Sequence, residues 1–313
     1  MKLAQRVALA TALLTVVLIA IGAYVRATGS GLGCPDWPTC HGGAIPPNNR
    51  HSIIEYLHRF VASSVGLLVI ATAVLAWKRY RHANFIVWTS IVAVPLVGFQ
   101  GVLGAITVYR ELPPEIVATH LVAAMVVLGF ELAVYIAMYL EDPANSGRLE
   151  QLSGATQLPG KLAVAAIAWL AAVMWIGGYM AESGAATACE GWPLCNGGVL
   201  PANDDQEITH MIHRYLAGLL VFFIAAFVVV AWRRRGELFW AAPVAIATAV
   251  LYIAQVLVGA FNVWYAFPDW LTVSHTALAA CVWFTLSIAV LFTFYSPVPA
   301  KERRPVSNAG VTA

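Results

Sequence analysis

Charged side chains are scarce in this chain of 313 residues, of which 11% are charged and 60% are hydrophobic. An ordinary soluble domain carries about 25% charged residues, and the mean hydropathy of this chain is +0.75. A water-soluble fold of this size cannot hide so much apolar surface, so the composition indicates the lipid bilayer as solvent. The net charge of +2 says little about partners, but no basic face with interleaved aromatics occurs, so we do not expect nucleic acid as a partner.

We do not interpret the N-terminal apolar run as a cleavable signal peptide. Lys2 and Arg6 precede an apolar run from Val7 to Val25, which is longer than the roughly 7–15 residues of a signal-peptide core. No clean small-residue cleavage pattern follows, so we interpret the run as the first of eight transmembrane helices. Spans must be helical because lipid offers no partner to backbone polar groups. The predicted spans are approximately 7–27, 57–77, 84–109, 116–140, 162–181, 210–232, 238–263 and 271–295.

The basic residues are distributed unevenly between the two ends of these spans. Of the 18 Lys and Arg residues, 13 fall on the side that carries both termini. The positive-inside rule therefore predicts a multi-pass protein of the plasma membrane with both termini in the cytoplasm. Segments 28–56 and 182–209 become long outer loops, residues 141–161 a cytoplasmic linker, and residues 297–313 a cytoplasmic tail.

The chain repeats itself after 155 residues without a gap. The residues that recur at this offset include a Trp, a Gln, two Cys and two His, and the pairs are Cys34 and Cys189, Trp37 and Trp192, Cys40 and Cys195, His58 and His213, Gln100 and Gln255, and His120 and His275. Chance agreement of such rare residues at one offset is very unlikely. We therefore predict an all-α membrane protein with eight transmembrane helices in two tandem pseudo-symmetric four-helix bundles, residues 1–140 and 162–296.

The duplicated histidines predict a haem site in each half. His58 and His120 lie near the outer ends of two spans that run in the same direction, as do His213 and His275 in the other half. Two imidazoles at one depth in a four-helix bundle suit the two axial positions of a haem iron. Acidic clusters are absent near them, so a closed zinc site is disfavoured.

The duplicated cysteines lie six residues apart in each outer loop. Because the outer face is oxidising, we expect disulfides Cys34–Cys40 and Cys189–Cys195. Each could be a structural staple over the haem edge or a labile redox group, since exposed short-loop disulfides can be reduced.

The halves differ most clearly at Glu55, whose counterpart is His210. Glu55 lies one helical turn before His58, where a carboxylate could act in proton transfer or stabilise a developing cation; alternatively it pairs with Arg59. Glu131, opposite Leu286, is a second mismatch whose role stays open. Arg59 and its equivalent Arg214 could contact haem propionates or could be interfacial snorkelling residues.

These residues resemble the haem A synthase family over nearly the whole chain. The resemblance rests on Glu55-Tyr56-Leu57-His58-Arg59, on His120, His213 and His275, and on a cysteine pair in both outer loops. It implies that the enzyme oxidises the C8 methyl of haem O to a formyl, giving haem A for cytochrome oxidase. It also implies that haem O synthase and oxidase assembly factors are partners.

The resemblance assigns a different haem to each half. His58 and His120 would flank the substrate haem O, with Glu55 near the reacting methyl, and His213 and His275 would be axial ligands of a haem B cofactor. The long farnesyl tail of haem O suits access between helices from the bilayer. Small residues, such as Gly98, Gly101 and Gly104, are expected to line close helix contacts.

Three other functions use some of the same residues. A di-haem electron carrier or quinone oxidoreductase would use the four histidines but gives no reason for Glu55 in only one half. A membrane disulfide oxidoreductase would use the cysteines and leave the histidines unexplained. A haem transporter would bind haem reversibly at an outer site.

Overall fold

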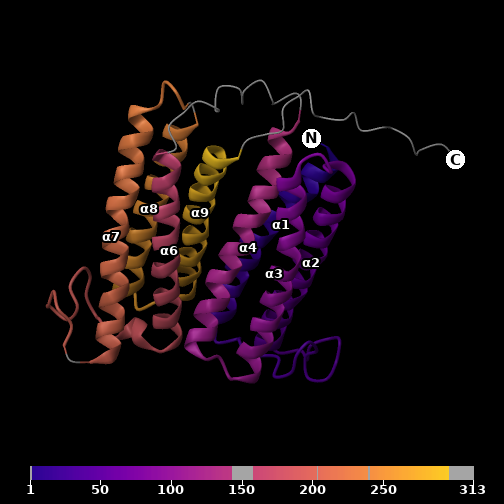
Figure 1. The fold of residues 1–313 in the computed structure, drawn as a ribbon. Helices are drawn as coiled ribbons and strands as arrows, with labels where there is room; N and C mark the ends of the chain where they lie inside the picture. The colour runs from indigo at the N-terminus through magenta and orange to yellow at the C-terminus, as the bar shows by residue number, and fades with distance from the viewer. Residues whose placement is uncertain (1, 143–157, 203, 239, 296–313) are drawn as a thin grey trace.

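The computed structural model describes residues 2–142, 158–202, 204–238 and 240–295, which fold as helices joined by loops (Figure 1). Eight helices in these ranges are long and apolar enough to cross a membrane. They are α1 (Leu3–Ala27), α2 (Arg50–Arg79), α3 (Asn84–Tyr109), α4 (Pro114–Leu140), α6 (Leu158–Glu182), α7 (Asp205–Arg233), α8 (Ala241–Trp264) and α9 (Asp269–Phe294). The prediction of an all-α membrane protein with eight spans is confirmed.

The two largest differences from the hydropathy prediction are the starts of α2 and α7, which begin at Arg50 and Asp205 because a polar first turn precedes the apolar part. The Asn49 side chain caps α2 by accepting a hydrogen bond from Ser52 N at 2.9 Å. The Asp204 side chain caps α7 in the same way, accepting from the backbone of the first helical turn. An N-cap oxygen of this kind satisfies amides that the helix itself leaves unpaired. The outer loops are therefore shorter than predicted, spanning 28–49 and 183–204.

The predicted linker 141–161 is helical in part, since α6 already begins at Leu158. Residues 143–157 of that linker and the predicted tail 297–313 lie outside the described residues.

The duplicated sequence gives duplicated local structure. Shifting α1–α4 by 155 residues reproduces the bounds of α6–α9 to within two residues at every helix end. The outer loops agree as well, because His41 and its equivalent Asn196 both adopt a positive φ, of 54° and 50°. The N-caps Asn49 and Asp204 are also equivalent positions. Each half therefore folds locally in the same way.

The two sets of four helices lie side by side, with α1–α4 in one and α6–α9 in the other (Figure 1). Contacts between the sets join α4 to α6, α1 to α9 and α4 to α9, so these four helices form the centre. The α2–α3 and α7–α8 pairs flank it. Both long loops lie at the end of the molecule opposite the N-terminus (Figure 1).

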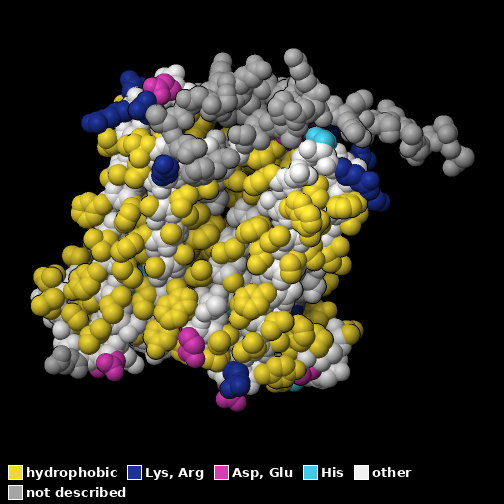
Figure 2. All heavy atoms as spheres, viewed as in Figure 1, with side chains coloured by type: hydrophobic (Ala, Val, Ile, Leu, Met, Phe, Trp, Pro, Cys, Tyr) yellow, Lys and Arg dark blue, Asp and Glu magenta, His cyan; other side chains and the backbone are white. Residues whose placement is uncertain are grey.

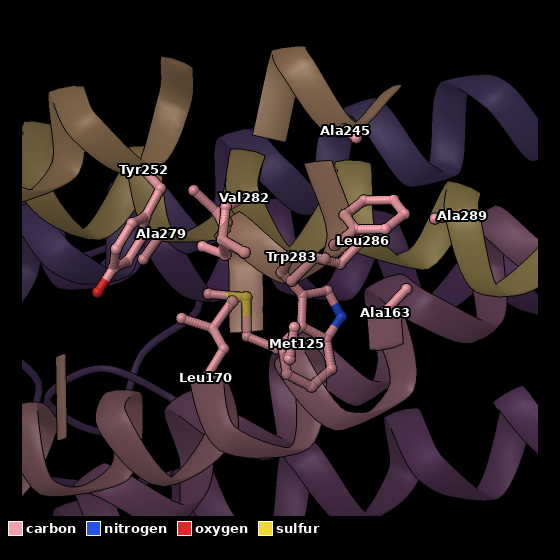
Figure 3. Close-up of a cluster of buried hydrophobic side chains, with 14 of the residues drawn as sticks. Met125, Ala163, Leu170, Ala245, Tyr252, Ala279, Val282, Trp283, Leu286 and Ala289 are labelled. Carbon is pink, nitrogen blue, oxygen red and sulfur yellow. The ribbon is translucent and has the colours of Figure 1, made fainter. Parts of the chain in front are cut away.

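The largest buried cluster crosses the boundary between the sets. Met125 from α4, Leu170 from α6, and Trp283 and Leu286 from α9 converge in it (Figure 3). On the face shown in Figure 2, hydrophobic side chains cover the surface between two charged ends. Many large hydrophobic side chains are exposed, and Phe222 is 70% exposed. A continuous exposed apolar surface of this kind is expected only where lipid covers it.

Candidate functional site

The four duplicated histidines form one pair in each half. His58 on α2 lies near His120 on α4. His213 on α7 faces His275 on α9, with their ring centroids 6.5 Å apart and the ring planes at 66°. Each side chain is half-buried. Within each half, two spans that are not neighbours in sequence therefore bring two imidazoles together.

A glycine on the neighbouring helix lies against each imidazole. A Cβ atom added at Gly22 would lie 3.1 Å from Cε1 of His58, and one at Gly104 would lie 3.7 Å from Cε1 of His120. In the other half, a Cβ at Gly177 would lie 2.8 Å from Cε1 of His213, and one at Gly259 would lie 3.0 Å from Cε1 of His275. The glycines form two pairs at the 155-residue offset, Gly22 with Gly177 and Gly104 with Gly259. Because glycine has no side chain, each imidazole can lie directly against a helix backbone, and its ring position is fixed by packing.

The residues of the C-terminal half fit a haem iron held by two imidazoles. Two metal–imidazole bonds of about 2 Å, with about 1 Å from each nitrogen to its ring centre, place two ligand rings about 6 Å apart. The observed separation of 6.5 Å is close to this value. The Nδ1 of His213 donates a hydrogen bond to the Val173 carbonyl at 3.1 Å, which leaves Nε2 unprotonated and available as a ligand.

We expect Gly177→Ala to weaken haem binding in the C-terminal half by about 10-fold or more, the effect of disturbing the support of a metal ligand. The added methyl would lie 2.8 Å from His213 Cε1, closer than packed atoms allow, so the imidazole must move. The haem absorbance per protein chain after purification measures the effect. Gly218→Ala on α7 is the control, because a Cβ there meets no atom within 4 Å. Equal haem content in both variants would contradict the packing role.

Glu55 and Arg59 form an ion pair in the N-terminal part of α2. Arg59 Nε lies 2.9 Å from Glu55 Oε1, and both side chains are largely buried. The remaining guanidinium nitrogens donate to the loop carbonyls of Asp36 at 2.6 Å, Thr39 at 2.7 Å and Cys34 at 2.8 Å. Four of the five N–H donors of Arg59 are thus used. Arg59 therefore holds the outer loop onto α2 and orients the carboxylate.

The equivalent Arg214 has a different environment. His210 occupies the place of the carboxylate, and its Nδ1 donates to the Ala185 carbonyl at 3.1 Å instead. Arg214 Nη1 donates to Pro193 and Leu194, both at 3.2 Å, while Nε and Nη2 are buried without a partner among the described residues. Unpaired buried donors of this kind suit an anionic group.

Both expected disulfides are present. Cys34 is bonded to Cys40 and Cys189 to Cys195, with Cα atoms 4.6 and 4.7 Å apart, and all four side chains are buried. Each bond closes a short turn at the outer end of its half.

Asp36 organises the turn that contains the first disulfide. Its carboxylate accepts hydrogen bonds from the Thr39 hydroxyl, from Gly42 N at 2.8 Å and from His41 N at 2.5 Å. These donors, the Thr39 hydroxyl foremost, lower the pKa of Asp36 to about 2. The equivalent position in the other loop is Gly191, where the Asn196 side chain replaces this arrangement by bonding Glu190 N and the Ala188 carbonyl.

The lowered pKa of Asp36 predicts a pH dependence of loop order. Because the folded turn lowers the pKa of Asp36, the ionised carboxylate stabilises the turn at pH values above 3.8, the ordinary pKa of the group. This stabilisation is lost as the pH falls towards about 2. The rate at which a phosphine reduces Cys34–Cys40, divided by its rate for Cys189–Cys195 in the same sample, should therefore stay constant down to about pH 4 and rise below it. Asp36→Asn should be fast at every pH, with the Cys189–Cys195 rate unchanged as control. Identical rates for the variant and the wild-type chain would contradict this role.

Three predicted residues lie away from the histidines. Glu131 is buried on α4 beside a small cavity at the opposite end of the bundle. The expectation that Gly98 and Gly101 line close helix contacts is wrong, because a Cβ at either position meets nothing within 4 Å. Spacing along α3 does not reveal which face meets a neighbour, and only Gly104 of the three lies against a partner, His120.

The chain resembles known proteins over nearly its whole length. The family model described as COX15-CtaA, cytochrome oxidase assembly protein, matches residues 5–53 and 48–287. The haem A synthase of Alkalihalophilus pseudofirmus is 31% identical over 302 residues, which cover 94% of this chain and 96% of that protein. The haem A synthase of Symbiobacterium thermophilum is 31% identical over 313 residues, with the same coverage of 94% and 96%. That of Halalkalibacterium halodurans is 32% identical over 222 residues, 70% of this chain and 72% of that protein. The chain therefore belongs to the COX15-CtaA family, the family of the haem A synthases.

Proposed function

We propose that this protein is a membrane-bound haem A synthase that oxidises the C8 methyl of haem O to a formyl group. The observation that carries the proposal is the duplicated histidine pair, combined with a buried carboxylate in one half only. Two equivalent histidine pairs with different surroundings are expected if one pair binds the haem that reacts and the other binds a resident haem cofactor. Family membership and the names of the relatives support the same reaction.

We assign the substrate site to the N-terminal half, residues 1–140, and the cofactor site to the C-terminal half, residues 162–296. In this scheme the two halves are related by tandem pseudo-symmetry. His58 and His120 would hold haem O, and His213 and His275 would hold haem B. A bound haem supplies the redox chemistry that an unactivated methyl needs. The polypeptide supplies position, because the glycines that face the imidazoles fix where each ring stands.

Glu55 would be the catalytic carboxylate. Its Oε1 accepts from Arg59 Nε, and Oε2 makes no hydrogen bond within the described residues. One oxygen is thus fixed while the other is free to take a proton from the reacting group or to stabilise positive charge there. Glu55 is only 6% exposed, which limits contact of the carboxylate with bulk water. His210 in the other half offers no equivalent acidic group.

Arg214 is the stronger candidate of the two arginines for a haem propionate. Its Nε and Nη2 have no partner among the described residues, whereas Arg59 has one N–H donor left. A propionate could satisfy the free donors of Arg214 with charge-assisted hydrogen bonds. We therefore assign Arg214 to the haem B propionates and Arg59 mainly to loop and carboxylate positioning.

We place the protein in the plasma membrane with both termini in the cytoplasm. The asymmetric distribution of basic residues supports this orientation. Both outer loops and the outer ends of the histidine helices then lie on the oxidising side. Haem O synthase and oxidase assembly factors are the partners that this reaction requires for its substrate and product.

The haem content of the purified protein separates this function from that of a di-haem electron carrier. In a host that makes no haem O, a haem A synthase should retain about one haem B per chain, at the C-terminal bis-histidine site. An electron carrier should retain two under the same conditions. Two permanently bound haem B groups, with neither lost from a Glu55→Gln variant, would favour the carrier.

A further inference from the structure

A small cavity lies inside the N-terminal half, between α1, α2, α3 and α4. The polar residues that line it are Thr11, Thr72, Ser90 and Glu131, and the cavity volume is about 10 Å³. A volume of this size holds about one water molecule. The cavity lies towards the N-terminal end of the bundle, because Thr11 begins the third turn of α1.

Glu131 has no partner in this cavity wall. The residue is 4% exposed, and neither carboxyl oxygen makes a hydrogen bond within the described part of the chain. Thr15 lies beside the carboxyl, but its hydroxyl donates to the Thr11 carbonyl at 3.0 Å. The other residues that face the cavity from α1, α2 and α3 carry hydroxyl or aliphatic groups, and none is ionisable. An ionised carboxylate without a cation or donor is strongly disfavoured, so Glu131 is held as the neutral acid.

The duplicated half shows that the fold does not need this polar cluster. All five polar positions have apolar counterparts 155 residues later, and these counterparts belong to the main hydrophobic core. The equivalent pairs are Thr11 and Ala166, Thr15 and Leu170, Thr72 and Phe227, Ser90 and Ala245, and Glu131 and Leu286. The same helices therefore pack well with an apolar interior. This polar cluster therefore occurs only in the half that also contains Glu55.

The cluster lies between the histidine pair and the N-terminal end of the bundle. Glu131 follows His120 by 11 residues on α4, about three turns and about 16 Å along the same face. Polar groups continue in the other direction, where buried Gln5 donates to the Met138 carbonyl at 2.9 Å and to Asp142 Oδ2 at 3.3 Å. Buried polar groups therefore occur both at the end of the bundle and around Glu131.

We propose that Glu131, with one water in the adjoining cavity, is a proton-binding site that serves the N-terminal half. Glu131 passes its proton through the water to a base that the reaction creates in that half, and it takes up one proton from the end of the bundle that carries the N-terminus. The carboxyl therefore returns to the neutral acid, one proton is transferred, and no oxidation state changes. The hydroxyls of Thr11, Thr72 and Ser90 keep acceptor capacity for the water. The proton-binding site stands on its own geometry, whereas its service to the reaction rests on the proposed function.

Infrared difference spectroscopy on the purified full-length protein tests the proton-binding site without haem O. The wild-type spectrum should contain a protonated carboxylic C=O band that Glu131→Gln lacks and that shifts after exchange into D2O. Thr248→Val, which removes a buried hydroxyl at the position equivalent to Ala93 of the cavity wall, should keep the band. Absence of a Glu131-dependent band, or a band that D2O leaves unshifted for days, would overturn the proposal.

The service to the reaction is tested with Glu131→Gln and with Glu131→Leu, the residue that the other half uses. Both should fold and retain haem B, since Leu at the equivalent position packs well, while conversion of haem O slows by about 10-fold or more, as for loss of a proton-transfer group. Wild-type conversion rates in Glu131→Leu would overturn this part. If the wild-type chain made no haem A at all, the proposed function would fail, while the infrared result would still decide the proton-binding site.

Discussion

Alanine at His213 or His275 should remove the haem B that the purified protein retains. The ring centroids lie 6.5 Å apart, a separation at which both imidazoles could bind one haem iron. Loss of one ligand removes a metal bond and also leaves an apolar gap in the bundle, so we expect affinity to fall by more than the 10–100-fold effect of disturbing a supporting contact, roughly 100-fold or more. The pyridine haemochrome spectrum per protein chain measures the retained haem.

The internal repeat supplies matched controls for this prediction. His58→Ala and His120→Ala make the same change at equivalent positions in the other half. They should keep haem B and its spectrum while losing haem O binding. If His213→Ala kept wild-type haem content, or if all four variants lost haem B equally, the division between a substrate half and a cofactor half would be wrong.

Glu55→Gln should abolish conversion of haem O while leaving haem B bound. The amide oxygen of Gln can still accept from Arg59 Nε, so the contacts of Arg59 with the outer loop should persist. The amide cannot take a proton, and loss of a general acid–base group typically slows turnover by about 10²–10⁴-fold. Haem A formed per unit time by the purified protein, supplied with haem O, gives the rate.

Two controls separate a chemical role of Glu55 from a structural one. An unchanged reduction rate of Cys34–Cys40 would show that the loop is still held by Arg59. His210→Gln changes the equivalent residue of the other half and should leave conversion near the wild-type rate. Full activity of Glu55→Gln would remove the carboxylate from the mechanism.

Hydropathy predicted the number and class of the helices because lipid imposes the length and composition of a span. It placed the start of α2 at residue 57 instead of Arg50, since a capped polar turn looks like loop in a window of apolar residues. The packing of α1, α4, α6 and α9 at the centre was not predicted, because every span here is apolar on most faces.

The histidine pairs and both disulfides were found from the repeat, which places the same residue types at the same position in two copies. The glycines that face the imidazoles carry the same signal, because Gly22 and Gly177 recur at that offset. Their contacts with histidines on other helices could not be predicted without the folded structure. The loop contacts of Arg59 also depend on the folded turn, in which carbonyls of residues 34–39 converge on one guanidinium. Sequence alone left Arg59 and Arg214 alike, whereas their surroundings differ.

The most direct test of the account is to extract and identify the haems after expressing the protein, with and without a haem O synthase, in a host that lacks haem A. We predict haem A only when haem O is supplied, and haem B in both cases. Haem B alone in both cases, from protein that is folded and inserted in the membrane, would contradict the proposed reaction and favour an electron carrier.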